Sequence, residues 1–542
     1  MLVLAGAGSG KTRVITRRVA YMVSQGIAPW AILAITFTNK AAGEMTERVE
    51  ALGVSRGATI ATFHGLCARL LREFGDQAGL AGSYSIYDQA DQLRCIKEAM
   101  VKLELNISHF PPGAILGRIS RAKNALHGPS EVAAAAGDYF TKNVAKVYPV
   151  YQRILAANNA LDFDDLLMRL ALLMRDKPEV RQALAQRFQY VLIDEYQDTN
   201  HAQYYIAHGI ALEHENICAT GDPDQSIYAW RGADIKNIME FEADYPDALV
   251  VRLEANYRST APILAAADSL IAHNRQRKHK RLQPTREGGT EVEVVRLQDE
   301  HLEAREVASV LAELNRQGTP YREMAVFYRV NALSRVLEEA FRSASIPYQI
   351  ARGVEFYNRK EIKDVLAYLK LLVNPDDDLA CRRIINVPAR GIGAVTVNRL
   401  AAWAEGAGES LLAACGAGQQ AGLGKAASAK LAAFAALMAE LEAMSRAPVR
   451  PIVEAAIMRT GIEHALRRDE QQKQALRNVQ ELVSAAEEFD KQNPQADLGD
   501  YLQQVSLVSD LDAIDPAAGS VTFMTLHAAK GLEFSAVVMV GC

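Results

Sequence analysis

The segment AGAGSGKT, residues 5–12, constrains the fold of this chain more than any other feature. It lies between an apolar run, MLVLAG, and a helical pattern, RVITRRVAYMV. In this setting a Gly-rich loop turns backbone N–H groups toward phosphates, and the N-terminus of the following helix adds a positive dipole. The segment departs from the GxxxxGK[ST] pattern only at Ala5, which replaces a glycine. We therefore predict a phosphate-binding loop in an α/β fold, with an ordinary Gly-rich turn as the alternative.

A pair of acidic residues supplies the partner that such a loop needs. Asp194 and Glu195 end the apolar run YVLIDE, so both carboxylates are expected at the carboxyl edge of a sheet, where α/β folds bind ligands. Lys11 would contact the β- and γ-phosphates, while Thr12 and Asp194 would hold Mg²⁺. Glu195 would orient and deprotonate the attacking water. An Asp-Glu pair alone is usually a solvated turn, but together with the Lys11 loop it predicts an ATPase site.

Short apolar runs that end in polar or Gly-rich turns recur along the chain, as is typical of buried parallel strands. They are MLVLAG, ILAITFT, ATIATFH, YVLIDE, NICATGD and LVVRLEANYRS, then EVEVVRL, EMAVFYR and VTFMTLHAAKGLEFSAVVMVGC. Two largely helical stretches interrupt the two series. The pattern predicts an α/β protein with two parallel sheets flanked by helices, each sheet interrupted by an inserted, mainly helical domain.

Composition narrows the class of protein and of partner. The chain has 542 residues, 49% of them hydrophobic and 23% charged, which is typical of a globular protein with several domains. Its net charge of −5 means that a polyanion must be held by a local groove. Six cysteines without a CxxC pair disfavour a zinc site and a disulfide framework, and favour a cytoplasmic setting. No apolar run reaches about 18 residues, so neither a membrane anchor nor export is predicted.

Eight motifs in order carry a specific resemblance. They are AGAGSGKT, AITFTNKAAGEM, TFHGLCARLLR, LDFDDLL, IDEYQDTN, GDPDQSIYAWRGAD, LEANYRS and MTLHAAKGLEF. In order and spacing they resemble the UvrD/Rep/PcrA-like superfamily 1A DNA helicases. The resemblance implies two RecA-like P-loop NTPase domains. Domain 1A would comprise residues 1–65 and 187–258 with domain 1B inserted at 66–186, and domain 2A would comprise 259–353 and 518–542 with domain 2B inserted at 354–517.

The resemblance also implies roles in the nucleotide site. Gln225 resembles the γ-phosphate sensor, because a neutral amide can both donate to a phosphate and accept from water. Tyr257 resembles the residue that stacks on adenine, Arg258 a cation placed against the γ-phosphate, and Glu533, helped by Gly531, the carboxylate near the nucleotide sugar. The catalytic set is Lys11, Glu195, Gln225 and Arg258. The other predicted ATP contacts are Ala5, Gly6, Ala7, Gly8, Ser9, Gly10, Thr12, Tyr257, Gly531 and Glu533.

The resemblance also implies a track of residues that binds single-stranded DNA, in loops that follow β-strands. Its members are Phe37, Thr38, Asn39, Phe63, His64, Tyr228, Trp230, Arg231, Thr525 and His527. Aromatic platforms and phosphate donors are what binding of single strands without sequence preference requires. Each aromatic alone is more often a core residue. Trp230 is the strongest candidate, because it lies beside Arg231 in a polar, Gly-flanked loop and is one of only three Trp.

Two further features concern duplex DNA. Gly391 and Gly393, in RGIGAVTV, resemble an element whose small residues let backbone N–H groups approach a phosphate, although a plain tight turn is nearly as consistent. A basic run carries five fixed charges in seven positions, Arg275, Arg277, Lys278, Lys280 and Arg281. Such a run is usually a solvated face, and beside a DNA motor it is equally well interpreted as a contact for backbone phosphates.

These observations predict an ATP-dependent DNA helicase or translocase that uses ATP and Mg²⁺. The 3′-to-5′ polarity and a role in DNA repair or replication come from the resemblance alone. Expected partners are single-stranded DNA, single/double-strand junctions and repair or replication proteins. The alternatives are the helicase part of a helicase-nuclease recombination complex, a P-loop ATPase or nucleotide kinase that does not act on nucleic acid, and an inactive truncated P-loop ATPase.

Two family elements are missing from the sequence given, a Gln motif before the first strand and an arginine-finger motif after Cys542. We therefore expect a fragment that binds nucleotide weakly, hydrolyses it very slowly and does not unwind duplex DNA. We also expect an exposed apolar edge at Val537, Val538, Met539 and Val540.

Overall fold

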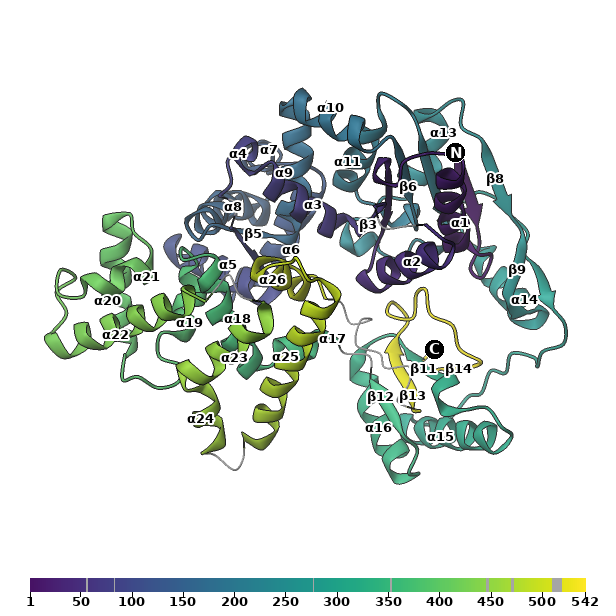
Figure 1. The fold of residues 1–542 in the computed structure, drawn as a ribbon. Helices are drawn as coiled ribbons and strands as arrows, with labels where there is room; N and C mark the ends of the chain where they lie inside the picture. Colours follow the sequence, from purple (N-terminus) through teal and green to yellow (C-terminus); the bar gives the residue numbers. More distant parts are fainter. Residues whose placement is uncertain are drawn as a thin grey trace.

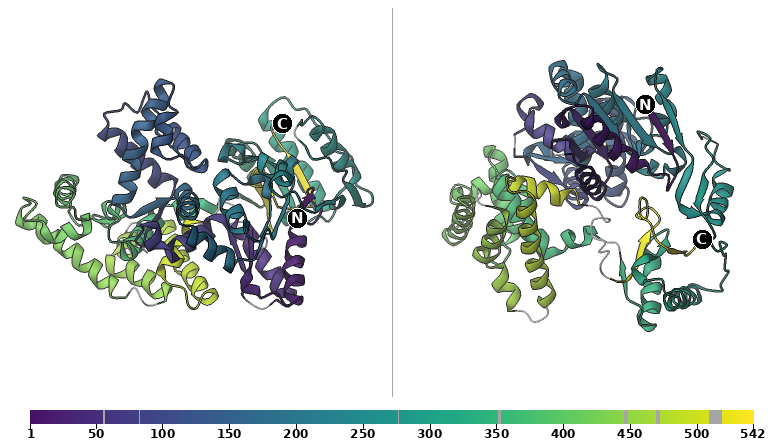
Figure 2. Two further views of the ribbon diagram at one scale, coloured as in Figure 1. Left: turned by 90° about the horizontal axis from the view of Figure 1, so that it is seen from above. Right: turned by 45° about the vertical axis from the view of Figure 1, so that its right-hand side comes forward.

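The computed structural model describes residues 1–54, 57–81, 83–275, 277–350, 353–444, 448–468, 472–508 and 519–542. Two parallel sheets lie on the right in Figure 1, one above the other, and two groups of helices extend to the left. Figure 2 shows the same arrangement from two other directions. Within the described ranges, we find no helix that combines the length and the apolar character needed to cross a membrane.

The first sheet has six strands in the order β3-β2-β6-β7-β1-β8, and every neighbouring pair is parallel. They are β1 (Leu2–Ala5), β2 (Ile32–Thr36), β3 (Thr59–Thr62), β6 (Tyr190–Ile193), β7 (Ile217–Gly221) and β8 (Val250–Leu253). The six apolar runs of the first predicted series each contain one of these strands. The prediction of a buried parallel sheet in this part of the chain is therefore confirmed.

Helices cover both faces of this sheet, because alternate strand residues point to opposite sides. Val3 packs in one core with α1 (Lys11–Ser24) and α2 (Asn39–Ala51). Leu2 and Leu4 pack in the other core, against a second set of helices. That set is α3 (Phe63–Glu73), α9 (Phe163–Asp176), α10 (Pro178–Arg187) and α11 (His201–Ala211).

The second sheet has four parallel strands in the order β12-β13-β11-β14. They are β11 (Met324–Tyr328), β12 (Tyr348–Ile350), β13 (Val521–Thr525) and β14 (Ala536–Met539). Its core includes α15 (Glu300–Arg316) and α16 (Ser334–Ser343). β14 is an edge strand on which Val537 is 44% and Met539 57% exposed, whereas Val540 is buried. The predicted apolar edge is thus only partly exposed.

Two strand predictions need correction. Residues 291–297, EVEVVRL, form no strand, and Val294 is 95% exposed. A strand needs a neighbour for its backbone hydrogen bonds, and no described strand pairs with this segment. The run LVVRLEANYRS contains two strands, because β9 (Ala255–Thr260) leaves the sheet after β8 and pairs with β10 (Gln283–Arg286) in a separate parallel ribbon. Between β9 and β10 lies α14 (Ala261–Ile271).

The first group of helices has a core of its own. It contains α5 (Gln89–Lys102), α6 (Pro112–Asn124) and α8 (Tyr139–Ala157), with α7 (Pro129–Ala134) packed on α8. A two-stranded ribbon of β4 (Ser85–Tyr87) and β5 (Ala160–Asp162) joins this group to the sheet. All of α9 and most of α3 and α10 fall within the predicted insertion 66–186, yet these helices pack in the core of the first sheet. The division into domains stays a prediction.

The second group of helices shares one large core. It comprises α18 (Lys360–Val373), α19 (Asp378–Ile384), α20 (Ala394–Ala407), α21 (Leu411–Ala414), α22 (Lys425–Glu442), α23 (Val449–Thr460), α24 (Ile462–Arg467), α25 (Lys473–Gln492) and α26 (Leu498–Ser506). It is reached through α17 (Gly353–Asn358). The predicted boundary at residues 517–518 reaches into 509–518, which lie outside the described residues.

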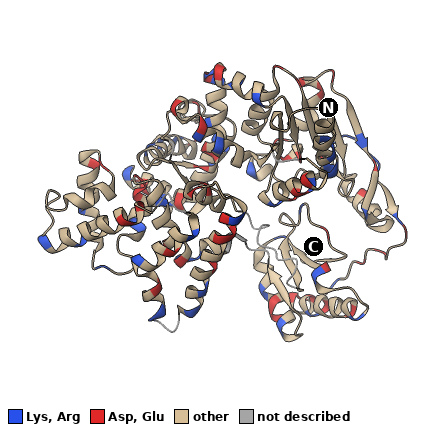
Figure 3. Ribbon diagram, viewed as in Figure 1, with Lys and Arg blue, Asp and Glu red and all other residues tan. Residues whose placement is uncertain are grey.

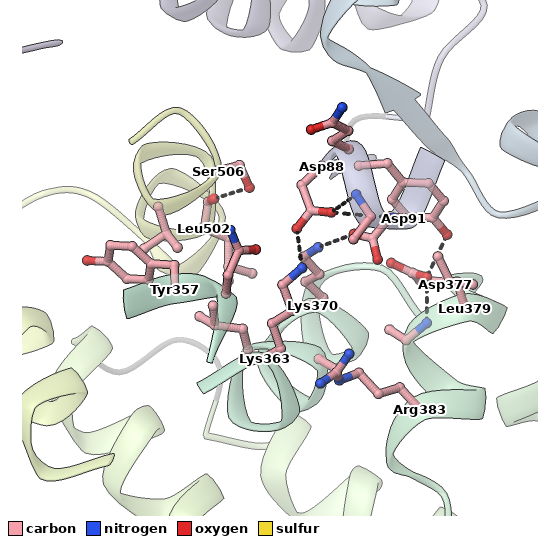
Figure 4. Close-up of a pocket in the computed structure, with 18 of the residues that line it drawn as sticks. Asp88, Asp91, Tyr357, Lys363, Lys370, Asp377, Leu379, Arg383, Leu502 and Ser506 are labelled. Atoms are coloured by element: carbon pink, nitrogen blue, oxygen red, sulfur yellow. Dashed lines mark hydrogen bonds and ion pairs between the residues drawn. The ribbon is translucent and has the colours of Figure 1, made fainter. Parts of the chain in front are cut away.

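The two groups of helices meet in a polar joint around a cavity of about 490 Å³, drawn in Figure 4. Lys363 pairs with Asp88 at 2.9 Å and Lys370 with Asp91 at 3.3 Å. Lys and Arg are interspersed with Asp and Glu on both groups of helices and around both sheets in Figure 3, in keeping with the small net charge.

Candidate nucleotide site and strand-binding surface

The phosphate loop connects β1 to α1, as its sequence predicts. Gly8 and Gly10 have φ values of 70° and 87°, in the left-handed region that favours glycine. Gly10 is the N-cap of α1, so Lys11 is the first residue of that helix. The hydroxyl of Ser9 is buried and has no hydrogen-bond partner among the described residues. A buried donor aimed into a helix N-terminal loop fits a phosphate oxygen.

Lys11 lies between the residues predicted as base and sensor. Its Nζ is 2.9 Å from Glu195 Oε2 and 3.1 Å from Gln225 Oε1, and its side chain is only 8% exposed. Burial alone would lower the pKa of Lys11, but the negative charges of Glu195, Asp194 and Asp222 raise it above its ordinary value. Lys11 is therefore a fixed cation at the end of the loop.

Glu195 is held as an anion beside this cation. Burial would raise the pKa of Glu195, but the positive charges of Lys11 and Lys530 lower it to about 2. Gln197 Nε2 donates to its Oε2 at 2.6 Å, which fixes the carboxylate further. The backbone at Glu195 is left-handed, with φ 52°, and such strain in a non-Gly residue often accompanies a functional site.

Asp194 and Thr12 form the predicted metal position. Thr12 Oγ1 donates to Asp194 Oδ2 at 2.9 Å, and Thr220 Oγ1 donates to Asp194 Oδ1 at 2.7 Å. Burial and the neighbouring charge of Glu195 raise the pKa of Asp194. A hydroxyl and a carboxylate oxygen are the kind of ligand that Mg²⁺ takes alongside water and phosphate, so the residues present fit this ion.

The β9 strand and the segment that follows β13 of the second sheet close the site from the opposite side. Arg258, on β9, forms an ion pair with Glu533, which follows β13, and the Arg258 Nε is buried without a partner among the described residues. Tyr257 is 61% exposed, with a ring free to stack. Lys530 Nζ contacts Asp198 and donates to the Gln225 carbonyl at 2.9 Å. Lys530 lies in the motif MTLHAAKGLEF but is not among the predicted site residues.

One cavity of about 810 Å³ collects nearly all of these residues. Of the predicted nucleotide contacts, it is lined by Gly6, Ala7, Gly8, Ser9, Gly10, Lys11, Thr12, Asp194, Glu195, Gln225, Tyr257, Arg258, Gly531 and Glu533. Ala5 is fully buried at the end of β1 and does not line it. Gly531 has φ 90°, which only glycine adopts readily. The volume is suited to a small ligand that reaches both sheets.

An aromatic cluster lies beside this cavity and also joins the two sheets. Tyr228 Oη donates to the His527 carbonyl at 3.1 Å, and Trp230 meets the His527 ring edge to face at 5.8 Å. The Arg231 guanidinium lies 4.7 Å from the Trp230 ring centre. Trp230 is 61% exposed, so it retains an open surface. Burial, with the charges of Arg329 and Arg231, lowers the pKa of His527.

Comparison with known proteins identifies the family. Residues 1–246 match the UvrD/REP helicase N-terminal domain, and residues 251–411 and 425–542 match the UvrD-like helicase C-terminal domain. The chain belongs to the UvrD/REP helicase family. It is 42% identical over 555 residues to the ATP-dependent DNA helicase PcrA of Bacillus subtilis, and 41% identical over 549 residues to those of Staphylococcus epidermidis and Staphylococcus aureus. Each match covers 100% of this chain and 75% of the relative.

Several residues of the track expected from the family resemblance have structural partners instead. Phe63 is 1% exposed in the core of the first sheet, so its ring has no open face for a base. The Thr38 hydroxyl caps α2 by accepting from the Ala41 N–H. Asn39 Nδ2 donates to the Leu507 carbonyl at the end of α26. We leave Phe63 out of the proposed strand-binding surface.

The remaining track residues lie at or just after the ends of β-strands, although His64 belongs to α3 and Thr525 to β13 and not to the predicted loops. Phe37, directly after β2, is partly buried and meets Phe63 edge to face. His64 is half-buried, and its burial, with the charge of Arg231, lowers its pKa to about 4, so it is neutral at physiological pH. Thr525 ends β13, and its hydroxyl accepts from the Ala528 N–H. Their contacts with a strand stay a prediction.

The basic run is neither a solvated face nor an open phosphate contact. Arg277 forms a bidentate pair with Asp224, with both distances 3.0 Å. Lys280 contacts Asp222 and Asp224, and Lys278 pairs with Glu242 on α13 (Phe241–Asp244). Both predicted interpretations are therefore wrong for these three cations, because folding brings the acids of GDPDQ against them. Only Arg275 and Arg281 remain exposed; Gln276 lies outside the described residues.

The two glycines of RGIGAVTV lie in the turn before α20, at the left end of the helices in Figure 1. Gly391 has φ 69°, and its carbonyl accepts from Lys430 Nζ at 3.1 Å. Gly393 is the N-cap of α20 and has no side chain that would block access to the helix N-terminus. Their contact with a duplex phosphate stays a prediction.

Proposed function

We propose that this chain is an ATP-dependent DNA helicase in which the two sheets are RecA-like motor domains and the two groups of helices are insertions. The observation that carries the proposal is the single cavity that the phosphate loop, Asp194, Glu195, Gln225 and Arg258 share, with the Trp230 cluster beside it. The similarity to relatives named ATP-dependent DNA helicase supports it. Unwinding in the 3′-to-5′ direction and a role in repair or replication are the finer parts of the proposal.

The chemistry assigns one task to each side chain around the cavity. Lys11 contacts the β- and γ-phosphates, and the loop N–H groups and Ser9 contact the remaining oxygens. Thr12 and Asp194 hold Mg²⁺, which neutralises charge on the phosphates when it is bound. Glu195 accepts the proton of the attacking water. It can do so once the γ-phosphate replaces it as the partner of Lys11.

Two cations and a platform complete the site from outside the first sheet. Arg258, on β9, and Lys530, which follows β13 of the second sheet, both line the cavity, so closure of the two sheets brings additional positive charge to the γ-phosphate. Tyr257 stacks on the base, and the Arg258–Glu533 pair opens when the ligand binds. Hydrolysis thereby changes the distance between the sheets, and the Trp230 and His527 cluster joins the same two sheets.

The proposed nucleic-acid partner is single-stranded DNA and its junction with duplex, bound without sequence preference. Tyr228, Trp230 and His527 offer rings, while Arg231 and Arg329 supply cations beside them. Partners in repair or replication, and the cytoplasmic setting predicted from the cysteines, belong to the proposal as well.

The decisive experiment uses the purified protein extended downstream through the arginine-finger motif, and measures its ATP turnover with and without single-stranded DNA and its strand displacement on a tailed duplex. We expect DNA to stimulate turnover, and Lys11→Ala to abolish it while single-strand binding persists. A helicase assignment is untenable if turnover is insensitive to DNA. A nucleotide kinase would instead transfer phosphate to an acceptor without DNA.

A further inference from the structure

The connector between the two sheets passes along the phosphate loop, along β9 and along the loop that carries Gln225. Residues 277–286 follow α14 and end in β10. The Leu282 side chain lies against Gly6 so closely that a Cβ there would meet its Cδ2 at 2.6 Å. β10 pairs with β9, from which Asn256 Nδ2 donates to the Ala7 carbonyl at 2.6 Å. The connector thus touches the phosphate loop directly and also through β9.

Lys280 is the most buried cation of this connector. Its side chain is 4% exposed, and so is that of its partner Asp222, while Asp224 is 8% exposed. Lys280 Nζ lies 2.9 Å from Asp224 Oδ2 and also contacts Asp222 Oδ1. Arg277 holds the same Asp224 by two hydrogen bonds. A lysine so buried needs paired acids, and both acids lie in the loop that carries Gln225.

Asp222 is linked to Lys11 and to Glu195 through one bridging glutamine each. Its Oδ2 accepts from Gln225 Nε2, and its backbone N–H donates to Gln197 Oε1 at 2.9 Å. Gln225 Oε1 in turn accepts from Lys11, and Gln197 donates to Glu195. Asp222 N–H, Gln197, Glu195, Lys11 and Gln225 therefore form a ring of hydrogen bonds around the expected position of the γ-phosphate. Lys280 contacts the ring from outside, at Asp222.

We propose that Lys280 is a positioning residue for ATP hydrolysis, which fixes Asp222 and through it the amide of Gln225. The proposal rests on the proposed role of Gln225 as the γ-phosphate sensor. Because Lys280 sits on the connector between the sheets, it also links their relative position to the orientation of that amide. Lys280 does not line the nucleotide cavity, so it acts on the catalytic rate and not on nucleotide affinity.

The first test compares Lys280→Met with Lys278→Met in the full chain. Lys278 belongs to the same run and is 12% exposed, but its partner Glu242 is 54% exposed and lies outside the nucleotide cavity. With saturating single-stranded DNA, we expect Lys280→Met to lower kcat about 10- to 100-fold, the scale of a misplaced catalytic group, with little change in the KM for ATP. Lys278→Met should retain the wild-type rate. Lys280→Arg, which keeps the charge, should recover part of the loss.

A double-mutant cycle with Gln225→Ala separates positioning from a general structural role. If Lys280 acts through Gln225, Lys280→Met should cause no further loss of kcat in the Gln225→Ala background. An equal loss in both backgrounds would overturn the proposal, and so would a Lys280→Met enzyme as active as Lys278→Met. If Lys280→Met does not fold, as judged by its melting curve, Lys280→Gln takes its place, because it keeps an N–H donor without the charge. Absence of turnover in the wild-type protein extended through the arginine-finger motif would instead contradict the proposed function itself.

Discussion

The nucleotide cavity and the joint between the two groups of helices use the same kinds of side chain in opposite ways. Both are lined by lysines, arginines and aspartates from separate elements. In the nucleotide cavity, buried atoms of Ser9, Asp198 and Arg258 have no hydrogen-bond partner among the described residues. Of the described residues that line the joint, none has such an atom. Among the described residues, the proposed ligand site thus contains buried polar atoms without partners and the joint does not.

One buried aspartate, Asp377, satisfies several hydrogen-bond donors of the joint. Asp377, labelled in Figure 4, is fully buried. It accepts hydrogen bonds from Tyr87 Oη at 2.7 Å, Ser85 Oγ at 2.8 Å and the Ala380 N–H at 2.9 Å. Burial raises the pKa of Asp377, although the nearby charge of Lys370 opposes the shift. In the nucleotide cavity the cations prevail and lower the pKa of Glu195. We infer that the joint stabilises one arrangement of the helices, whereas the cavity keeps its charges available.

The largest effect is expected from Glu195→Gln. The amide keeps the shape of the side chain but loses the base, so hydrolysis should slow by about 10²- to 10⁴-fold while ATP still binds. Single-turnover hydrolysis and binding of a fluorescent ATP analogue on the same variant measure both quantities. Glu44→Gln at the rim of the cavity is the matched control. Equal loss of ATP binding and of hydrolysis would mean that Glu195 has a structural role, like Asp377 in the joint.

In the joint, Asp377→Ala should lower stability without altering chemistry. Unpaired buried hydroxyls of Tyr87 and Ser85 cost about 1–3 kcal/mol each, so we expect the free energy of unfolding to fall by roughly 3 kcal/mol. Urea unfolding followed by circular dichroism checks this, with the exposed neighbour Asp376→Ala as control. Nucleotide affinity measured in native buffer should remain that of the wild type. A change in nucleotide affinity with unchanged stability would remove the contrast between the two sites.

In the aromatic cluster beside the nucleotide cavity, Trp230→Ala should weaken single-strand binding. Loss of one stacked base corresponds to about 1–3 kcal/mol of binding free energy, and DNA-stimulated ATPase should fall more than basal ATPase. Fluorescence anisotropy with a labelled oligonucleotide measures the affinity. Trp30, which is 58% exposed and outside the cluster, provides the control variant Trp30→Ala. If the melting temperature falls and the affinity does not, Trp230 is a packing residue.

The smallest expected effect concerns acid pH. As the pH falls, the contributions of Glu195 and Asp377 to the free energy of unfolding should change in opposite directions. The folded pKa of Glu195, about 2, is below the ordinary value of about 4.3, so Glu195 contributes stability that is lost as the pH falls through that interval. The pKa of Asp377 is raised, so its contribution to stability increases as the pH falls. Unfolding between about pH 5 and pH 3 should therefore depend less on pH in Glu195→Gln and more in Asp377→Asn, each compared with wild type. A change of the same sign in the pH dependence of unfolding of both variants would contradict the opposite pKa shifts of Glu195 and Asp377.

Most of the first sheet and the phosphate loop could be predicted from the sequence. Buried parallel strands are apolar on both faces, so they are visible as short runs, and AGAGSGKT is a local pattern that requires only a strand before it and a helix after it. The same reasoning failed for residues 291–297, because a strand also needs a neighbour that no local pattern specifies. The sequence pattern does not show the burial of Phe63 for a similar reason, since an aromatic residue after a strand can face the core or solvent; its contact with a DNA strand stays a prediction.

What the sequence alone determined is therefore local: the strands, the loop of Lys11, and the acids Asp194 and Glu195 after a strand. Contacts between distant segments were decided only by the tertiary structure. Lys280 and Asp222 are separated by 58 positions, and Lys530 and Asp198 by 332. The local sequence around a basic residue in a polar stretch is the same whether folding places that residue against solvent, a ligand or a buried acid. The difference lies in burial, which makes an unpaired charge costly and forces each cation onto an acid or a proposed ligand.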